Sequence, residues 1–150
     1  MIEIQAPNQI KIDGFSIFLA GSIDMGTSID WQNELVARLL DYKGYLYNPR
    51  RKDWDSSWEQ KIENGQFREQ VEWELDAMDK ADLIIYYFAK DSKSPITLLE
   101  LGLHKDDNII VCCPEGFYRK GNVDIVCKKY NIKTCKTLNE LVIQIINELK

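Results

Sequence analysis

The chain is poor in the residues and segments that mark metalloproteins, disulfide-rich proteins and membrane proteins. It has one histidine, His104, and four cysteines, none of them in C-x-x-C spacing, so we expect no metal site, no cofactor and no disulfide framework. His104 itself is expected to be an exposed helix residue. The longest apolar runs have the length of a strand and no signal peptide precedes them, which predicts no membrane span and a cytoplasmic location.

Basic residues are also scarce. The 19 Lys and Arg residues are outnumbered by 24 Asp and Glu residues, giving a net charge of −5. This balance argues against nucleic acid or an anionic membrane as the main partner, and leaves small ligands open. No repeat, linker or low-complexity stretch divides the sequence, so we expect residues 1–150 to form a single domain.

What the sequence does contain is a regular alternation of strand and helix patterns. Apolar runs typical of buried strands are FSIFLA, GYLYNP, DLIIYYF, NIIVCCP and residues 132–134. Helical spacing occupies residues 29–42, 67–78, 94–102, 123–130 and 138–149. The pattern predicts an α/β, flavodoxin-like (Rossmann-like) three-layer sandwich, with a five-stranded, mainly parallel sheet and helices on both faces. Residues 1–14 are expected to add an N-terminal hairpin or an edge strand.

The stretch SPITLLELG contains the most unusual carboxylate. Ser94 is a good N-cap for this helix, and Ile96, Leu99 and Leu103 recur at the spacing of one buried face. Glu100 is then either a surface glutamate lying along the leucines or an ionised nucleophile that the helix N-terminus favours. Because a glycine inside a helix costs about 1 kcal/mol relative to alanine, we expect another group to approach Gly102 closely.

Glu74 is a second candidate. It shares the apolar stripe of its helix with Phe67 and Val71, so its carboxylate should be paired, hydrogen-bonded or turned toward a cavity. The alternative is that Glu74 simply forms an ion pair with a basic residue at the edge of the buried face of its helix, such as Arg68 or Lys80. Two carboxylates that face one cleft suit sugar chemistry, with one as nucleophile and the other positioning the substrate.

Ligands of such sheets bind beyond the carboxyl ends of the strands. There, Gly21, Ser22 and Asp24 belong to a GSIDMG loop whose N–H groups could approach a ligand, although an ordinary tight turn explains it equally. Trp54 and Trp58 lie in a long polar loop, where they either cover a planar ligand or pack as a lid.

These residues together resemble the nucleoside 2-deoxyribosyltransferase superfamily, which includes the nucleoside 5'-monophosphate N-glycosidases. The resemblance runs from about Phe15 to Asn122 and rests on IFLAGSIDMG, NPRRKDW, QVEWELDAMDKADLIIYYF and PITLLELGL. It implies that Glu100 attacks the anomeric carbon, after which a second base completes transfer or water completes hydrolysis. Glu74 falls where transferases have an aspartate near the substrate. Asn122 matches an asparagine donated to a neighbouring subunit's sugar, which implies a homo-oligomer.

Three residues depart from the pattern of the family. Phe18 replaces a tyrosine that hydrogen-bonds the nucleophile in many members, so another group must steer Glu100. Ser94 occupies the position of a base-protonating aspartate in the transferases, whereas the monophosphate hydrolases have a serine there to hold phosphate. Asp24 replaces the arginine that the hydrolases use on phosphate, and its carboxylate would repel a dianion. We expect cleavage or exchange of the N-glycosidic bond of a (deoxy)nucleoside. The alternatives are a nucleoside 5'-monophosphate hydrolase and a non-catalytic nucleotide-binding protein.

Overall fold

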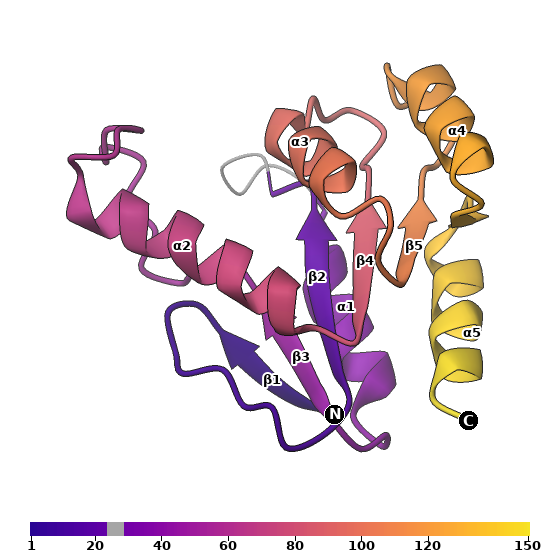
Figure 1. Cartoon of the computed structure of the whole chain (residues 1–150), viewed down its shortest axis with the longest axis horizontal. Coiled ribbons are helices and arrows are strands. Elements are labelled where there is room, and N and C mark those ends of the chain that lie inside the picture. Colours follow the sequence, from indigo (N-terminus) through magenta and orange to yellow (C-terminus); the bar gives the residue numbers. More distant parts are fainter. Residues whose placement is uncertain (24–28) are drawn as a thin grey trace.

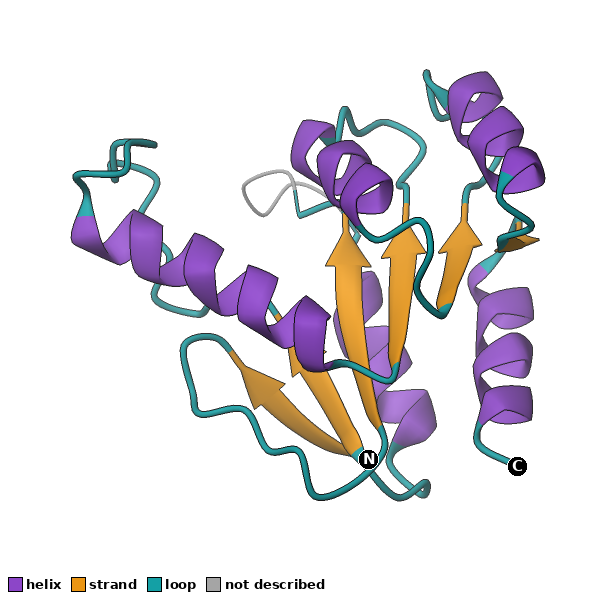
Figure 2. Cartoon of the chain, viewed as in Figure 1, coloured by secondary structure: helices purple, strands orange, loops and turns teal. Residues whose placement is uncertain are grey.

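A computed structural model describes residues 1–23 and 29–150 of the chain (Figure 1). The described residues form six strands and five helices (Figure 2). The strands are β1 (Ile2–Gln5), β2 (Ser16–Gly21), β3 (Tyr45–Asn48), β4 (Leu83–Tyr87), β5 (Ile109–Cys112) and β6 (Lys133–Cys135). The helices are α1 (Trp31–Leu39), α2 (Gly65–Lys80), α3 (Pro95–Leu103), α4 (Lys120–Lys129) and α5 (Leu138–Glu148).

The strands form a single parallel sheet in the order β1-β3-β2-β4-β5-β6. Without β1 this is the flavodoxin-like order, so the predicted α/β class is confirmed. The sheet has one strand more than the five expected, because β1 pairs with the outer edge of β3. The amino group of Met1 anchors that edge by donating to the carbonyl oxygens of Leu39 (2.5 Å) and Leu40 (3.0 Å).

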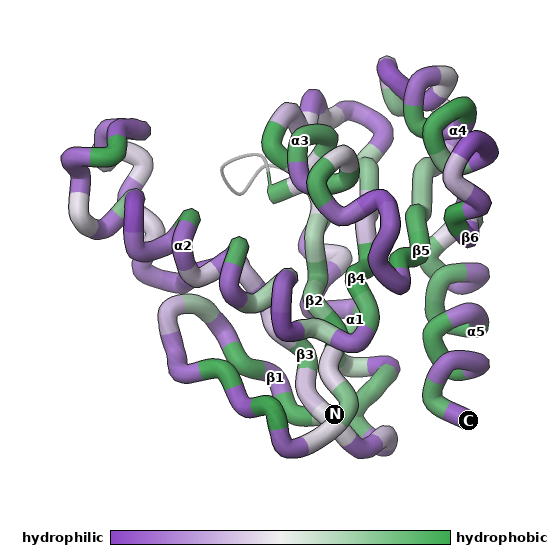
Figure 3. Tube along the Cα trace, in the orientation of Figure 1, coloured by the Kyte–Doolittle hydropathy of each residue, from purple (hydrophilic) through white to green (hydrophobic). Residues whose placement is uncertain are grey.

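Helices cover both faces of the sheet and create two apolar cores. On one face Phe18 and Tyr86 of the sheet pack with residues of α2, α3 and α4, such as Trp73. On the other face Leu19 packs with residues of α1 and α5, such as Leu35. Because neighbouring strand residues point to opposite faces and both faces are covered, the central strands are mostly apolar (Figure 3). In the described part of the chain, no helix is long and apolar enough to cross a membrane.

The carboxyl ends of β2 and β4 lie side by side, and the chain leaves them toward opposite faces of the sheet. β2 is followed by α1, whereas β4 is followed by α3, which covers the other face (Figure 1). Gly21 ends β2 opposite Tyr87, with φ at +154°. A Cβ there would lie 2.4 Å from the Tyr87 carbonyl oxygen, so only glycine fits. This close approach explains Gly21 by packing, at the edge where ligands of such sheets bind.

Candidate active site

Helix α3 points Glu100 into the protein. The buried residues of α3 are Thr97, Glu100 and Leu101, and Glu100 is only 8% exposed. By contrast, the stripe expected to be buried is about 60% exposed at each of its residues, which are Ile96, Leu99 and Leu103. The prediction of the buried face was therefore wrong. Glu100 shares the buried face with Thr97 and Leu101, so this helix buries its less apolar face.

Gly102 lies beside this exposed stripe. The expectation of a close neighbour is wrong for the single chain, because apart from the adjoining residues and backbone of α3 itself, nothing among the described residues lies within 4 Å of where its Cβ would be. Helix α2 likewise buries a different face from the one that the spacing predicted. Its buried residues are Gln70, Trp73, Ala77 and Met78, while Val71 and Leu75 are 37% and 39% exposed. Apolar side chains thus remain on the outer surfaces of both helices that carry the two candidate carboxylates.

Glu74 of α2 and Glu100 of α3 are close enough to influence one another. Burial raises the pKa of Glu100 from its ordinary value of 4.5 to about 8, and the negative charge of Glu74 adds to the rise. Glu100 is therefore protonated in the free protein at neutral pH, against the expectation of an ionised carboxylate. Glu100 lies beyond the first turn of α3, where the helix dipole has faded and desolvation dominates.

The carboxyl group of half-buried Glu74 is also perturbed. Burial raises its pKa to about 7, and a hydrogen bond from Gln70 partly opposes that rise. The suggested rim partners are engaged elsewhere: Arg68 with Glu72 at 3.8 Å, and Lys80 with Asp76 at 2.6 Å. Glu74 therefore faces inward without a cationic partner among the described residues, and two carboxyl groups with raised pKa values share one site.

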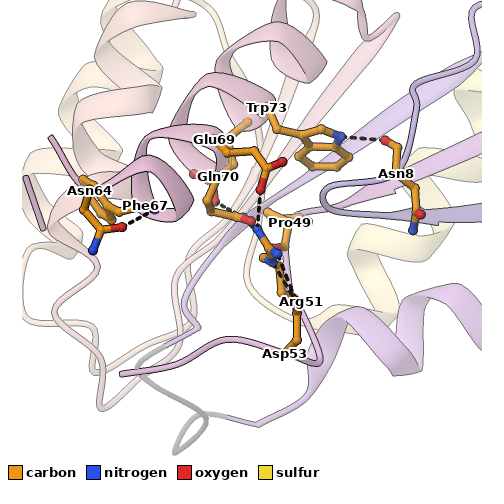
Figure 4. Close-up of polar contacts among 10 residues, drawn as sticks. Asn8, Pro49, Arg51, Asp53, Asn64, Phe67, Glu69, Gln70 and Trp73 are labelled. Carbon is orange, nitrogen blue, oxygen red and sulfur yellow. Dashed lines mark hydrogen bonds and ion pairs between the residues drawn. The ribbon is translucent and has the colours of Figure 1, made fainter. Parts of the chain in front are cut away.

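Gln70 connects Glu74 to the sheet. Its amide Nε2 donates to Glu74 Oε1 at 2.6 Å and to the carbonyl oxygen of Pro49, just after β3, at 2.8 Å. Figure 4 shows Gln70 pointing from α2 toward Pro49, beside Arg51, which pairs with Asp53 and Glu69. The sequence analysis missed Gln70, although a glutamine four residues before a glutamate on one helix face is a recognisable signal.

Three buried serine hydroxyl groups meet where β2, the β4–α3 loop and α3 come together. Ser22 Oγ lies 2.6 Å from Ser92 Oγ and 2.5 Å from Ser94 Oγ, and Ser92 and Ser94 are 2.7 Å apart. The N–H of Ala89 donates to Ser22 Oγ at 2.9 Å, and the indole N–H of Trp31 donates to the Ser22 carbonyl oxygen at 3.1 Å. The sequence analysis did not foresee Ser92, because hydroxyl groups from separate segments meet only in the fold.

Ser94 occupies the N-cap position of α3, as predicted, but in an unusual way. Its φ of 45° is in the left-handed region, and its hydroxyl caps no N–H group of the helix. The hydroxyl joins the serine cluster (Ser22, Ser92 and Ser94) instead. A left-handed serine is a strained backbone feature of the kind that gathers at functional sites. The amino end of α3 consequently lacks a side-chain cap within the described residues.

The remaining predicted residues are not joined to this arrangement. The Trp54 and Trp58 rings are 5.0 Å apart at 65°, and the Arg51 guanidinium lies 5.2 Å from the Trp58 ring. Asn122 is exposed on the first turn of α4. Within the described residues, no hydrogen bond, ion pair or ring contact links these side chains to Glu74 or Glu100. Asp24 lies outside the described residues.

The only histidine is not exposed as expected. His104 is 7% exposed, and its Nδ1 lies 2.7 Å from Asp107 Oδ2 at the end of α3. Across residues 1–23 and 29–150, no group of three or more His, Cys, Asp and Glu side chains is arranged to hold a metal ion. Glu74 and Glu100 are therefore the inward carboxyl groups that the described residues bring to the site.

Taken together, the fold and site define a flavodoxin-like α/β protein with two inward carboxyl groups beside the carboxyl edge of its parallel sheet. A family model described as nucleoside 2-deoxyribosyltransferase like matches residues 14–117. The chain belongs to this family, which confirms the resemblance inferred from its motifs. The matched residues include Glu74, Ser94 and Glu100 and end before Asn122.

Comparison with solved structures shows the same fold elsewhere. The chain is similar to a conserved protein from Enterococcus faecalis V583, with a TM-score of 0.63 and 14% sequence identity, over 91% of this chain and 99% of that one. At this identity the likeness is one of fold alone. No curated protein matches the chain significantly.

Proposed function

We propose that the protein cleaves or exchanges the N-glycosidic bond of a (deoxy)nucleoside-type substrate, with Glu100 as the nucleophile. The observation that carries this proposal is the pair of inward carboxyl groups with raised pKa values, in a member of a nucleoside 2-deoxyribosyltransferase like family. In a retaining reaction Glu100 attacks the anomeric carbon and the base leaves with the bonding electrons. A second base or water then displaces the glutamate from that carbon.

The two carboxyl groups supply the proton that this chemistry needs. With pKa values near 7 and 8, Glu74 and Glu100 hold at least one proton between them at neutral pH. A sugar whose anomeric carbon becomes positively charged favours ionisation of the carboxyl group beside it, which is Glu100. The proton then resides on Glu74, where it can hold the sugar or protonate the departing base.

The serine cluster is proposed to receive the 5' end of the substrate, together with Gly21 and the loop that follows it. Ser22 and Ser94 offer hydroxyl groups beside the uncapped amino end of α3. Hydroxyl donors at a helix N-terminus suit a phosphate, so this observation favours a nucleoside 5'-monophosphate hydrolase as the second candidate. Trp54 or Trp58 would cover the base in either case.

We further propose a homo-oligomer in which Asn122 reaches the site of a neighbouring copy. Asn122 is exposed, as a residue that serves another subunit must be. The outer face of α3 adds support, because Ile96, Leu99 and Leu103 form an apolar stripe with open space beside Gly102. A stripe of this kind is typical of a surface that another protein covers.

The decisive experiment is a product analysis. The protein is incubated with deoxynucleosides and, separately, with their 5'-monophosphates, each with and without a second free base, and the products are separated by chromatography. Exchanged nucleosides support transfer, and free base without exchange supports hydrolysis. Binding without any product would refute the enzyme and support the non-catalytic alternative.

A matched pair of variants tests the assignment of the nucleophile. Glu100→Gln keeps the size of the side chain but removes the nucleophilic oxygen, so it should bind substrate and lose turnover. Glu72→Gln changes an exposed carboxylate that pairs with Arg68 on α2, and should retain full activity. Full activity in Glu100→Gln would remove Glu100 from the reaction.

A further inference from the structure

Tyr86 has a buried hydroxyl group that nothing in the described structure uses. The side chain is completely buried, and its hydroxyl has no hydrogen-bond partner among the described residues. Tyr47, on β3, is equally buried, but its hydroxyl donates to the Lys11 carbonyl oxygen at 2.6 Å. Because nearly all buried hydroxyl groups are paired in folded proteins, the unpaired one of Tyr86 needs an explanation.

The surroundings of Tyr86 point to Glu100 as its partner. Tyr86 lies on β4 between Ala20 of β2 and Val111 of β5, neither of which offers a polar side chain. It belongs to the core that α2, α3 and α4 cover. The charged groups that act on it are Glu100, from α3, and Asp107, from the turn that follows α3.

These two carboxyl groups are not equally available. Asp107 is already 2.7 Å from His104 Nδ1. No side-chain hydrogen bond to the Glu100 carboxyl is present among the described residues, although this group is nearly buried as well. An unpaired donor and an unpaired acceptor therefore lie on neighbouring elements of one core.

We propose that Tyr86 is the positioning residue of Glu100: its hydroxyl donates a hydrogen bond to the Glu100 carboxylate when that group ionises. The bond would hold the carboxylate in one orientation and make its ionised form more accessible in a buried site. Burial also raises the pKa of the Tyr86 hydroxyl, so this group stays protonated and remains a donor throughout the working pH range.

This assignment answers a question that the sequence raised. Phe18 lies on β2, in the same core as Tyr86, and has no hydroxyl with which to steer Glu100. Tyr86 provides a hydroxyl from the neighbouring strand instead. The catalytic consequence rests on the proposed function, whereas the hydrogen bond itself does not.

The test compares Tyr86→Phe with Tyr47→Phe, two changes that each remove one buried hydroxyl. The first measurement is a carbon-13 NMR titration of the Glu100 carboxyl, assigned by its absence in Glu100→Gln. Losing a hydrogen bond to a charged group should raise the pKa of Glu100 by about one unit in Tyr86→Phe. Tyr47→Phe should leave the pKa of Glu100 unchanged.

The second measurement separates positioning from stability. Tyr86→Phe should lower kcat about tenfold with little change in KM, and should not lower the melting temperature, because its hydroxyl has no partner to lose. Tyr47→Phe should show the reverse, a lower melting temperature with unchanged kcat. A lower melting temperature and normal kcat in Tyr86→Phe would make Tyr86 merely structural and overturn the proposal.

The titration also keeps this proposal distinct from the proposed function. If Glu100 titrates identically in Tyr86→Phe and the unaltered protein, the hydrogen bond does not exist, whatever the activity. If the unaltered protein turns over no nucleoside, the function is refuted while the titration still decides the bond. Should Tyr86→Phe not fold, 3-fluorotyrosine at position 86 replaces it. This stronger donor should lower the pKa of Glu100, and an unchanged pKa would overturn the proposal.

Discussion

Replacing Glu100 by glutamine should stabilise the protein, and by more at higher pH. In the unfolded chain this carboxyl has its ordinary pKa of 4.5, while burial raises the folded value to about 8. Between these values the folded state binds a proton that the unfolded state has released, so stability falls as the pH rises. The stability that the protonated Glu100 carboxyl contributes is fully present below pH 4.5 and is lost as the pH passes about 8.

The size of the effect follows from the two pKa values. The difference between 4.5 and about 8, at about 1.4 kcal/mol for each pKa unit, corresponds to about 5 kcal/mol above pH 8. Water entry and local relaxation reduce the penalty of a buried charge. We therefore expect the free energy of unfolding of Glu100→Gln to be higher than that of the unaltered protein by about 2 to 5 kcal/mol near pH 9. Near pH 5 the two free energies should differ little. The difference near pH 9 is a large fraction of the stability of an ordinary domain.

Urea unfolding at about pH 5, 7 and 9, followed by tryptophan fluorescence, measures this difference directly. The control is Glu72→Gln, which removes an exposed carboxylate and should change the free energy of unfolding by less than about 0.5 kcal/mol at every pH. If the advantage of Glu100→Gln is the same at pH 5 and pH 9, Glu100 is not a carboxyl whose ionisation burial suppresses, and the argument fails.

Three further predictions concern the surroundings of the site. Gln70→Leu removes the bond that holds down the pKa of Glu74, so a carbon-13 titration should show that pKa rising above about 7; an unchanged value would contradict the contact. Ser94→Gly and Ser94→Ala both remove the hydroxyl that joins Ser22 and Ser92, but only glycine relieves the left-handed backbone, so Ser94→Gly should be about 1 kcal/mol more stable than Ser94→Ala in thermal unfolding, and both should raise KM; equal stability of the two variants would contradict the strain. Leu99→Glu places a charge in the exposed stripe of α3 and should dissociate the proposed oligomer in light scattering with helical content intact; an unchanged mass would exclude this face as the interface.

The sequence predicted the architecture well because parallel strands that are buried on both faces have continuous apolar sequences, which are easy to recognise. Four such runs gave β2 to β5, and the glycine and proline residues around them marked where helices begin and end. β1 was harder, because IEIQ alternates over only four residues and gains its place by pairing with β3. A short edge strand is defined by a partner that is distant in the chain.

The site was less accessible to sequence analysis. Periodicity identified Glu74 and Glu100 as unusual but gave the wrong buried stripe for both helices, because each helix leaves large apolar residues exposed and buries polar ones. Nor could it give the direction of the pKa change: the helix N-terminus suggested an ionised Glu100, whereas desolvation keeps it protonated. The burial of a residue depends on which other elements pack against it, and the spacing of residues along one helix does not contain that information.

The orientation of α3 is the reverse of what stability alone would favour. A helix with a glutamate on one face and three large aliphatic residues on the other should expose the glutamate and bury the aliphatic residues. This one does the opposite, with Glu100 8% exposed and Leu99 59% exposed. The two partners that we propose, a substrate on the inner side and a second copy of the chain on the outer side, would account for the two faces. The burial of Glu100 also explains why Glu100→Gln should be more stable. Residues that serve a reaction often destabilise the folded state, so replacing them raises stability.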